Sequence, residues 1–140
     1  MKKRWLGILA GLIVAIQLVP YGRNHTDPPV RAEPPWDRPE TRALAGRACF
    51  NCHSNQTVWP WYSSIAPVSW LTQSDVDEGR GMLNFSEWDR TYKEAGKAPE
   101  VVRTGDMPPW YYTPMHSEAK LSATEREALA AGLKATLAAR

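Results

Sequence analysis

Prolines divide the chain into three sections. Six of its twelve prolines lie within residues 20–39, at Pro20, Pro28, Pro29, Pro34, Pro35 and Pro39. Proline has no amide hydrogen and biases the residue before it away from helical backbone, so a regular helix or a central strand is not expected here. We predict an extended linker over residues 20–39 that lets the following domain swivel. The alternative is that Trp36 folds back onto that domain.

The section before the prolines has the charge order of an export signal. A basic triplet at residues 2–4 precedes a mainly apolar stretch, residues 5–19, in which Gln17 is the one clearly polar member. As a helix this stretch would extend about 22 Å, which is shorter than the roughly 30 Å hydrocarbon core of a bilayer. The nearest small-x-small cleavage triplet ends at Ala32, further on than a signal peptidase usually cuts. We therefore expect residues 1–19 to be a cleaved signal peptide or, preferably, an uncleaved membrane anchor.

The third section, residues 40–140, is predicted to be one all-α domain. It shows no convincing strand alternation and no internal repeat. Pro67 suits the first turn of a helix, and the Ser-x-x-Glu or Ser-x-x-Asp spacing of a capping box predicts helix starts at Ser86 and Ser122. The expected helices cover residues 40–52, residues 67 to about 82, a segment from Ser86, a turn through Val101 and Val102 that ends at Gly105, and a last helix from Ser122 in which Leu129, Leu133 and Leu137 recur.

Size and charge narrow the function classes. A chain of 140 residues suits a single domain, and we expect a monomer. The 17 Lys and Arg residues against 15 Asp and Glu residues give a net charge of +2, and three of the positive charges lie in residues 2–4. The rest of the chain is close to neutral, which argues against nucleic acid as a partner.

The chain's only two cysteines lie in the string Cys49-Phe50-Asn51-Cys52-His53. On one helical turn, residues i and i+3 share a face, so both sulfurs can form thioethers to the vinyl groups along one edge of a porphyrin. His53, next in the chain, is then placed beneath the iron as proximal ligand. This spacing is the signature of covalent c-type haem attachment. Export agrees with it, because covalent haem attachment takes place outside the cytoplasm, where a free thiol pair would otherwise tend to oxidise.

Other interpretations of the cysteine pair are a structural disulfide, a thiol redox site and half of a zinc site. A redox pair would normally follow a strand in an α/β pattern, which this sequence lacks. Zinc would need His25 or His116, because there is no second pair of cysteines. We therefore favour one covalent haem c per chain.

A second axial ligand would decide what the haem does. A haem with two strong protein ligands shuttles electrons, whereas an open site can bind gas or peroxide. The donors are Met82, Met107, Met115, His25 and His116. Met107 precedes two prolines that should stiffen its loop in an extended form, so we predict Met107 as distal ligand. Met115, His116 or no protein ligand are the alternatives, and Met82 is expected to pack as core filler.

Aromatic side chains follow the cysteine string closely: Trp59, Trp61, Tyr62 and Trp70. We expect them to form the wall of the haem site, with ordinary core or surface packing as the alternative. The other ring hydrogen of His53 should be donated to a backbone carbonyl, and the loop over residues 60–67 is the natural candidate. The charged residues Asp75, Asp77, Glu78 and Arg80 are expected to form a solvated helix face.

The order of these features resembles a class I cytochrome c, and the flanks resemble a narrower group. The strings Cys49-Phe-Asn-Cys-His-Ser-Asn, Trp59-Pro-Trp-Tyr-Ser, Ala66-Pro-Val-Ser-Trp-Leu, Asn84-Phe-Ser-Glu-Trp and Met107-Pro-Pro-Trp-Tyr are similar to the bacterial haem-binding domain family, over about residues 43–137. The resemblance implies Cys49 and Cys52 as attachment sites, His53 as proximal ligand and Met107 as distal ligand. The chain departs from ordinary class I cytochromes in its aromatic-free last helix, where only Gly132 offers a close crossing.

Together these observations predict a monohaem electron carrier of the bacterial periplasm, tethered to the inner membrane, rather than an enzyme. Its partners would be redox proteins that dock transiently. The alternative is a haem sensor or a peroxidase-like module with an open or displaceable sixth site. The sequence shows no distal His and Arg pair placed for splitting peroxide.

Overall fold

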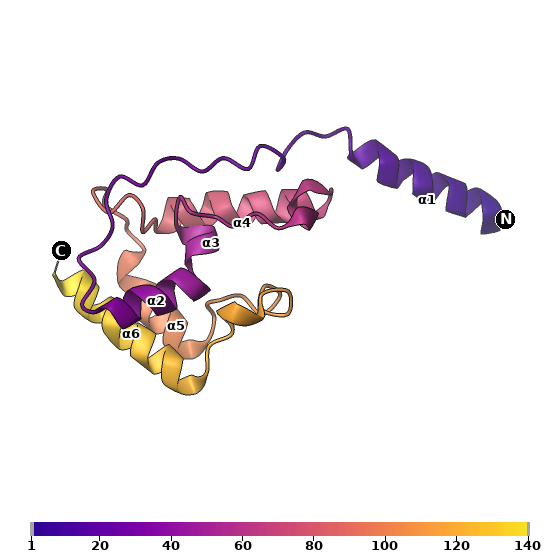
Figure 1. Ribbon diagram of the computed structural model, residues 1–140. Helices are drawn as coiled ribbons and strands as arrows, with labels where there is room; N and C mark the ends of the chain where they lie inside the picture. Colours follow the sequence, from indigo (N-terminus) through magenta and orange to yellow (C-terminus); the bar gives the residue numbers. More distant parts are fainter. Residues whose placement is uncertain (1, 140) are drawn as a thin grey trace.

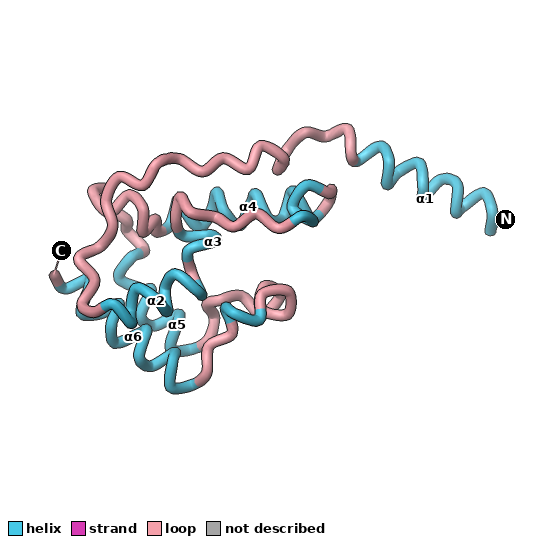
Figure 2. The backbone as a smooth tube through the Cα atoms, in the orientation of Figure 1, coloured by secondary structure: helices cyan, strands magenta, loops and turns pink. Residues whose placement is uncertain are grey.

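The computed structural model describes residues 2–139 (Figure 1), and this part of the chain consists of helices and loops without a strand (Figure 2). The helices are α1 (Lys2–Ile16), α2 (Pro39–Ala48), α3 (Phe50–His53), α4 (Val68–Met82), α5 (Ala98–Thr104) and α6 (Ala123–Ala138), with the 3-10 helices η1 (Trp61–Ser64), η2 (Ala95–Lys97) and η3 (Ser117–Ala119). The expected all-α class is confirmed, as are the helices predicted from Pro67 and from Ser122.

Helix α1 projects away from the other helices (Figure 1). None of its residues is buried. Its end is attached to the domain through Gln17, whose Nε2 donates to the Ala66 carbonyl (2.9 Å) and whose Oε1 accepts from the Ala66 amide (3.0 Å). Within the described residues, no helix combines the length and the apolar character needed to cross a membrane.

The proline-rich section lies along the domain instead of swinging free. The Ala32 amide donates to the Ser86 carbonyl (3.1 Å), and the Trp36 ring packs against Phe85 and Phe50, with centroid distances of 5.2 and 6.3 Å. The swivelling linker was therefore the wrong expectation, and the folded-back Trp36 is observed. A large apolar ring gains more from packing against the core than the chain loses in conformational freedom.

The first domain helix is broken at Cys49, where one helix over residues 40–52 was predicted. Cys49 has φ −123° and ψ −34°, which ends α2, and its carbonyl accepts from the amides of Cys52 and His53 to begin α3. The break lets α2 pack on α6 while α3 packs on α4. It also turns Phe50 into the core beside Phe85.

No helix begins at Ser86, so that prediction is wrong. The carbonyl of Ser86 accepts from the Arg31 and Ala32 amides (2.8 and 3.1 Å), and its hydroxyl accepts from the Asn55 amide (2.9 Å). Asp89, the acidic member of the Ser-x-x-Asp pattern, pairs with Arg31. The groups that could have capped a helix are bonded to residues distant in sequence, and these contacts override the local preference.

Helix α6 supports both halves of the domain. Ser122 and Glu125 form the predicted capping box, and Leu129 and Leu133 are buried in the core. A Cβ on Gly132 would lie 2.1 Å from Thr41 Oγ1, so the glycine allows α6 to cross α2 at Thr41 in close contact. Helix α6 also packs along α5.

Candidate functional site

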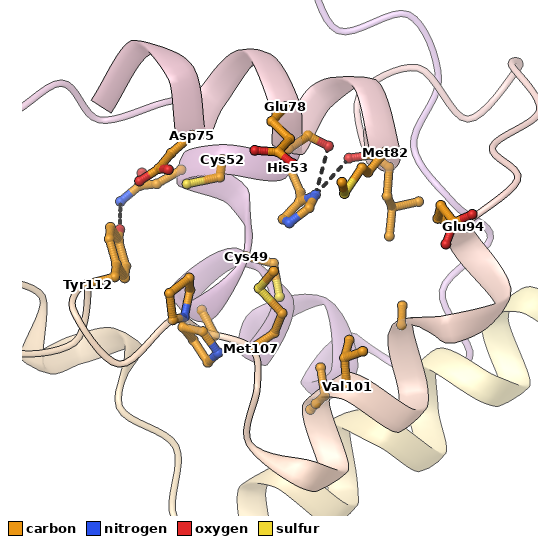
Figure 3. A pocket seen from close by; sticks show the side chains of 18 of the residues that line it. Cys49, Cys52, His53, Asp75, Glu78, Met82, Glu94, Val101, Met107 and Tyr112 are labelled. Atoms are coloured by element: carbon orange, nitrogen blue, oxygen red, sulfur yellow. Dashed lines mark hydrogen bonds between the residues drawn. The ribbon is translucent and has the colours of Figure 1, made fainter. Parts of the chain in front are cut away.

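A cavity of about 290 Å³ opens between α3 and α4 on one side and α5 with the following loop on the other (Figure 3). Cys49, Cys52, His53 and Met107 all line it. The remaining lining is largely apolar and includes Leu83, Phe85, Ala98, Val101, Val102, Pro108, Pro109 and Leu133. Mostly apolar walls with a few convergent polar groups are typical of ligand and cofactor sites. The structure thus brings together the two residues predicted to attach the haem and the two predicted to bind its iron.

The two thiols sit in an environment that keeps them protonated. Both cysteines are free. Burial raises the pKa of Cys49 to about 12, with a further contribution from Cys52. Burial and then the Asp75 carboxylate raise the pKa of Cys52 to about 11, against the opposing effect of Arg80. Thiol redox sites depend on a lowered cysteine pKa. These surroundings suit uncharged sulfur, as in a thioether.

The orientation and tautomer of His53 are fixed by two backbone carbonyls. Its Nδ1 lies 2.9 Å from the Gly79 oxygen and 3.0 Å from the Leu83 oxygen (Figure 3). Carbonyls only accept, so Nδ1 carries the hydrogen and Nε2 keeps a free lone pair. Burial lowers the pKa of His53, which favours the neutral ring that binds metals. The predicted acceptor in the loop over residues 60–67 was wrong, because α3 packs on the end of α4.

Helices α3 and α4 touch through their backbones at Gly79. A Cβ there would lie 2.5 Å from the Cys52 carbonyl oxygen and 2.9 Å from its carbon. Only glycine allows this approach, which holds the cysteine string against the helix whose end orients His53. An isolated glycine inside a helical pattern could have indicated the close contact.

Met107 is placed by the turn that ends α5. Gly105 has φ 85°, the left-handed conformation that suits glycine at a helix end. The chain then reverses, and the Met107 amide donates to the Val101 carbonyl (3.0 Å). This arrangement puts Met107 on the wall opposite His53 (Figure 3). This hydrogen bond to α5 fixes the start of the loop. The sequence analysis had attributed the stiffness of the loop to its two prolines alone.

The other candidate distal donors, Met115, His116 and Met82, lie in different environments from Met107. Met115 is 66% exposed and lies at a second, smaller cavity. In His116, Nδ1 donates to Glu118 Oε1 (3.1 Å) and Nε2 accepts from the Tyr62 hydroxyl (2.7 Å). Met82 lines the main cavity on the same side as His53 and is partly exposed, so its predicted place in the core was wrong. Met107 is thus the donor that faces His53.

The three tryptophans predicted to wall the site do not line the cavity. Trp59 donates to Asp27 Oδ2 (3.0 Å) and stacks on His25 with centroids 4.5 Å apart. Trp61 is 78% exposed in η1, and Trp70 lies half-buried in α4. The prediction fails because the chain after the cysteine string runs outward along α4 before it turns back. Among residues 2–139, no three His, Cys, Asp or Glu side chains are grouped so as to hold a metal ion.

Tyr111 and Tyr112 supply aromatic lining that the sequence reasoning missed. Asn51, between the two cysteines, donates from Nδ2 to the Tyr112 hydroxyl (2.6 Å). Burial raises the pKa of Tyr112, opposed by this hydrogen bond. Their position shortly after Met107-Pro-Pro could have indicated this, because residues that follow a predicted ligand in the same loop tend to lie near the same cavity.

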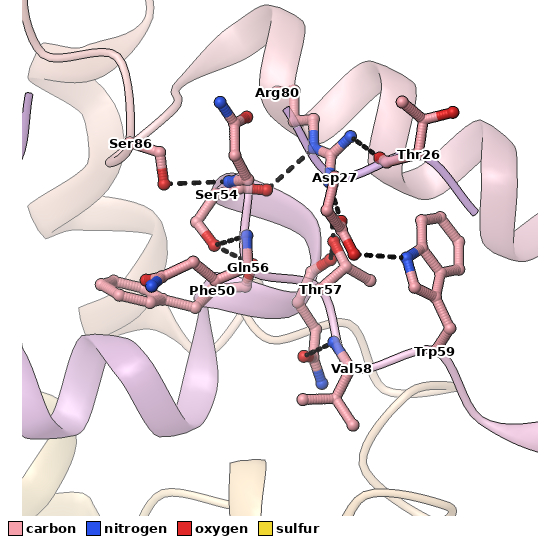
Figure 4. Close-up of polar contacts among 12 residues, drawn as sticks. Thr26, Asp27, Phe50, Ser54, Gln56, Thr57, Val58, Trp59, Arg80 and Ser86 are labelled. Atoms are coloured by element: carbon pink, nitrogen blue, oxygen red, sulfur yellow. Dashed lines mark hydrogen bonds and ion pairs between the residues drawn. The ribbon is translucent and has the colours of Figure 1, made fainter. Parts of the chain in front are cut away.

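Arg80 ties the cysteine string to the chain's earlier section (Figure 4). Its guanidinium donates to the Ser54 carbonyl (2.8 Å), the Thr26 carbonyl (2.8 Å), Asp27 Oδ1 (2.7 Å) and Thr57 Oγ1 (3.0 Å). The side chain is 15% exposed, so its predicted place on a solvated helix face was wrong. A guanidinium has five N–H donors, so one arginine can bind several acceptors at once. It fixes the chain that leaves His53.

Comparison with known proteins gives a family and no individual relative. A family model described as "Haem-binding domain" matches residues 11–135, which is most of the chain. No curated protein and no solved structure matches. The matched range includes the whole lining of the cavity.

Proposed function

The chain belongs to the haem-binding domain family, and from this premise we propose that it is a monohaem c-type cytochrome that transfers electrons. One observation carries the proposal. A single, mostly apolar cavity is lined by Cys49, Cys52, His53 and Met107, with His53 and Met107 on opposite walls (Figure 3). Each of these residue types is a known attachment or axial group for haem.

The cysteine string fits the attachment of a large apolar ring. Cys49 and Cys52 lie on one turn, closed by the hydrogen bond from the His53 amide to the Cys49 carbonyl (2.8 Å). Both thiols line the same cavity, where burial favours neutral sulfur. We propose that they hold the haem through two thioethers. The apolar lining then packs against the faces of the ring.

His53 and Met107 are the proposed axial ligands. The carbonyls of Gly79 and Leu83 direct the free Nε2 of His53 away from α4, and the Met107 thioether lies on the far wall. When bound, the haem supplies an iron that alternates between the ferric and ferrous states. The protein's part is to hold two ligands in fixed positions and to exclude water. Thioether ligation and burial both raise the reduction potential relative to two histidine ligands.

We further propose a class I cytochrome c-like domain in the bacterial periplasm, held at the inner membrane by its N-terminal section. The basic triplet before an apolar helix supports export, and the order of attachment turn, methionine loop and terminal helix supports the fold. The cavity lining carries Asp75, Glu78 and Glu94 against one Lys, Lys97. This excess of acid groups favours redox partners with a basic docking face, in a transient and salt-sensitive encounter.

Covalent attachment is tested by producing the chain together with c-type maturation machinery and staining for haem after denaturation. We expect haem to remain on the native chain and on His116→Ala, whose ring lies outside the main cavity. Replacing both cysteines by Ala should abolish covalent haem, and His53→Ala should impair or misligate it. Haem that is lost from the native chain on denaturation would contradict the proposal.

Carbon monoxide distinguishes the carrier from the alternative of a sensor or peroxidase-like module. The reduced native protein should bind no carbon monoxide at neutral pH, because Met107 occupies the sixth site. Met107→Ala should bind it readily. Rapid binding by the native protein would favour an open or displaceable site and overturn the assignment as an electron carrier.

A further inference from the structure

Two uncharged segments lie at one end of the domain. Residues 54–74 and residues 107–117 contain no Asp, Glu, Lys or Arg, in a chain of which 23% is charged. Beyond Tyr21, the exposed large hydrophobic side chains of the described chain fall within these two segments, apart from Val30 and Met82. The distribution is therefore not that of single apolar residues scattered over a surface.

We call this region the apical surface and define it by Val58, Trp61, Ile65, Leu71, Trp110 and Met115. Their exposure ranges from 46% for Ile65 to 84% for Trp110. Val58, Leu71 and Met115 line one cavity of about 130 Å³, so the two segments meet there. Exposed large apolar side chains that gather in one region are typical of a site of interaction.

Helix α1 leaves the domain beside this surface. The paired hydrogen bonds between Gln17 and Ala66 attach its end next to Ile65. Gly22 follows, with φ 80°, and a Cβ there would lie 2.2 Å from the Ser69 carbonyl oxygen. The chain is thus pressed onto the first turn of α4, and α1 continues outward from that end (Figure 1). The exposed apolar side of α1 and the apical surface are therefore adjacent.

The chemistry of both surfaces fits a lipid interface. Tryptophan and tyrosine concentrate at the headgroup level of membranes, and apolar side chains beside them can reach the edge of the hydrocarbon core. The exposed cations of residues 2–4 are complementary to anionic lipid headgroups. Helix α1 has 15 residues, extends about 22 Å and is apolar after its basic triplet, so inserting it draws the attached end of the domain toward the headgroups.

We propose that the apical surface rests in the headgroup region of the membrane when α1 is inserted in the lipid. This inference rests on the membrane tether of the proposed function. It further specifies the face of the domain that contacts the lipid. Asn51, Cys52, Asp75, Tyr111 and Tyr112 line both cavities. The Cys52 side of the haem cavity is thereby turned toward the membrane, and α6 toward the aqueous phase.

The test uses the full chain in vesicles of phosphatidylcholine and phosphatidylglycerol. Trp61→Cys and Trp110→Cys carry a thiol-linked fluorophore that is sensitive to polarity. Lys134→Cys, exposed on α6, is the matched control, and the parent chain measures any labelling of the half-buried Cys49 and Cys52. Emission is compared with and without lipids that carry a nitroxide near the headgroup, so quenching by haem cancels.

We expect emission at positions 61 and 110 to shift to the blue and to be quenched by nitroxide lipid at least twofold more than at position 134. If the protein floats with the vesicles but all three labels behave alike, the apical surface faces water and the inference is wrong. A blue shift that needs a high protein concentration and no lipid would assign the surface to a second copy and also overturn it. If the chain does not float, the membrane tether itself fails, while haem absorbance of the same samples still tests the haem assignment.

Discussion

The two walls of the cavity are held in different ways. The His53 wall is fixed by backbone contact, since Gly79 lies directly against Cys52 and two carbonyls orient the histidine ring. The Met107 wall is a loop that depends on one left-handed turn at Gly105 and one main-chain hydrogen bond. Changes in the first wall should therefore prevent attachment of the haem, whereas changes in the second should alter ligation and leave the haem attached.

The largest effect is expected from Gly79→Ala. The new Cβ would meet backbone atoms of Cys52, which cannot move aside as a side chain can, so we expect a loss of about 1–3 kcal/mol in the free energy of unfolding. The displaced cysteine string should also lose most of its covalent haem. Urea unfolding followed by circular dichroism, with haem content measured on the same samples, checks both results.

Gly81→Ala is the matched control for that change. Gly81 lies two residues further along α4, and a Cβ there meets nothing within 4 Å. Because Ala favours helix over Gly, we expect full haem content and a gain of up to about 1 kcal/mol. Equal behaviour of the two variants would show that contact between α3 and α4 does not hold the His53 wall.

Gly105→Ala should act on the Met107 wall alone. A φ of 85° costs an L-residue about 1–2 kcal/mol, and Gly105→Asn should cost less because Asn tolerates this region. The nearby Arg126 Nη1 is the end of a flexible side chain and can move. We expect covalent haem to be retained, with weaker binding of Met107 seen as increased affinity for carbon monoxide. Loss of haem comparable to that in Gly79→Ala would mean that the two walls are not separable.

Ser122→Ala should affect both walls equally, through the helix that supports them. Loss of the cap at the start of α6 should cost about 1 kcal/mol in thermal or urea unfolding. Because the residue lies outside the cavity, haem content and the absorption spectrum should not change. A spectral change would indicate that α6 positions the ligands directly.

The smallest effect concerns acid stability at the same cap. Hydrogen bonds from the Ser122 amide and the Arg47 guanidinium lower the pKa of Glu125 to about 2. Its stabilising contribution is therefore present above the unfolded pKa of about 4.3 and is lost as the pH falls toward 2. In Glu125→Gln, the loss of stability over this range should be shallower than in the native chain. Parallel curves would contradict the role of this carboxylate.

Features that depend on neighbours in the chain could be predicted from the sequence. The capping box at Ser122, the helix after Pro67 and the shared face of Cys49 and Cys52 follow from spacing alone. Met107 could be singled out because a loop before the last helix offered it as a stiffly held donor. Cys49, Cys52 and Met107 all line the cavity.

Features that depend on contacts between distant segments could not be predicted. Ser86 has the local pattern of a helix start, but its groups bond to the chain near Ala32. The tryptophans were predicted to line the cavity because they follow the cysteine string in sequence. Tyr111 and Tyr112, which are distant from that string in sequence, line it instead. The acceptor for His53 depends on how α3 packs on α4, which no local pattern specifies.

The most direct test is the visible absorption spectrum of the oxidised native protein beside Met107→Ala and Met115→Ala. If one haem is held between His53 and Met107, the native protein and Met115→Ala show the far-red sulfur-to-iron band, and Met107→Ala loses it with a change of spin state. A band that survives in Met107→Ala, or a high-spin spectrum in the native protein, would contradict the account of two opposed ligand walls.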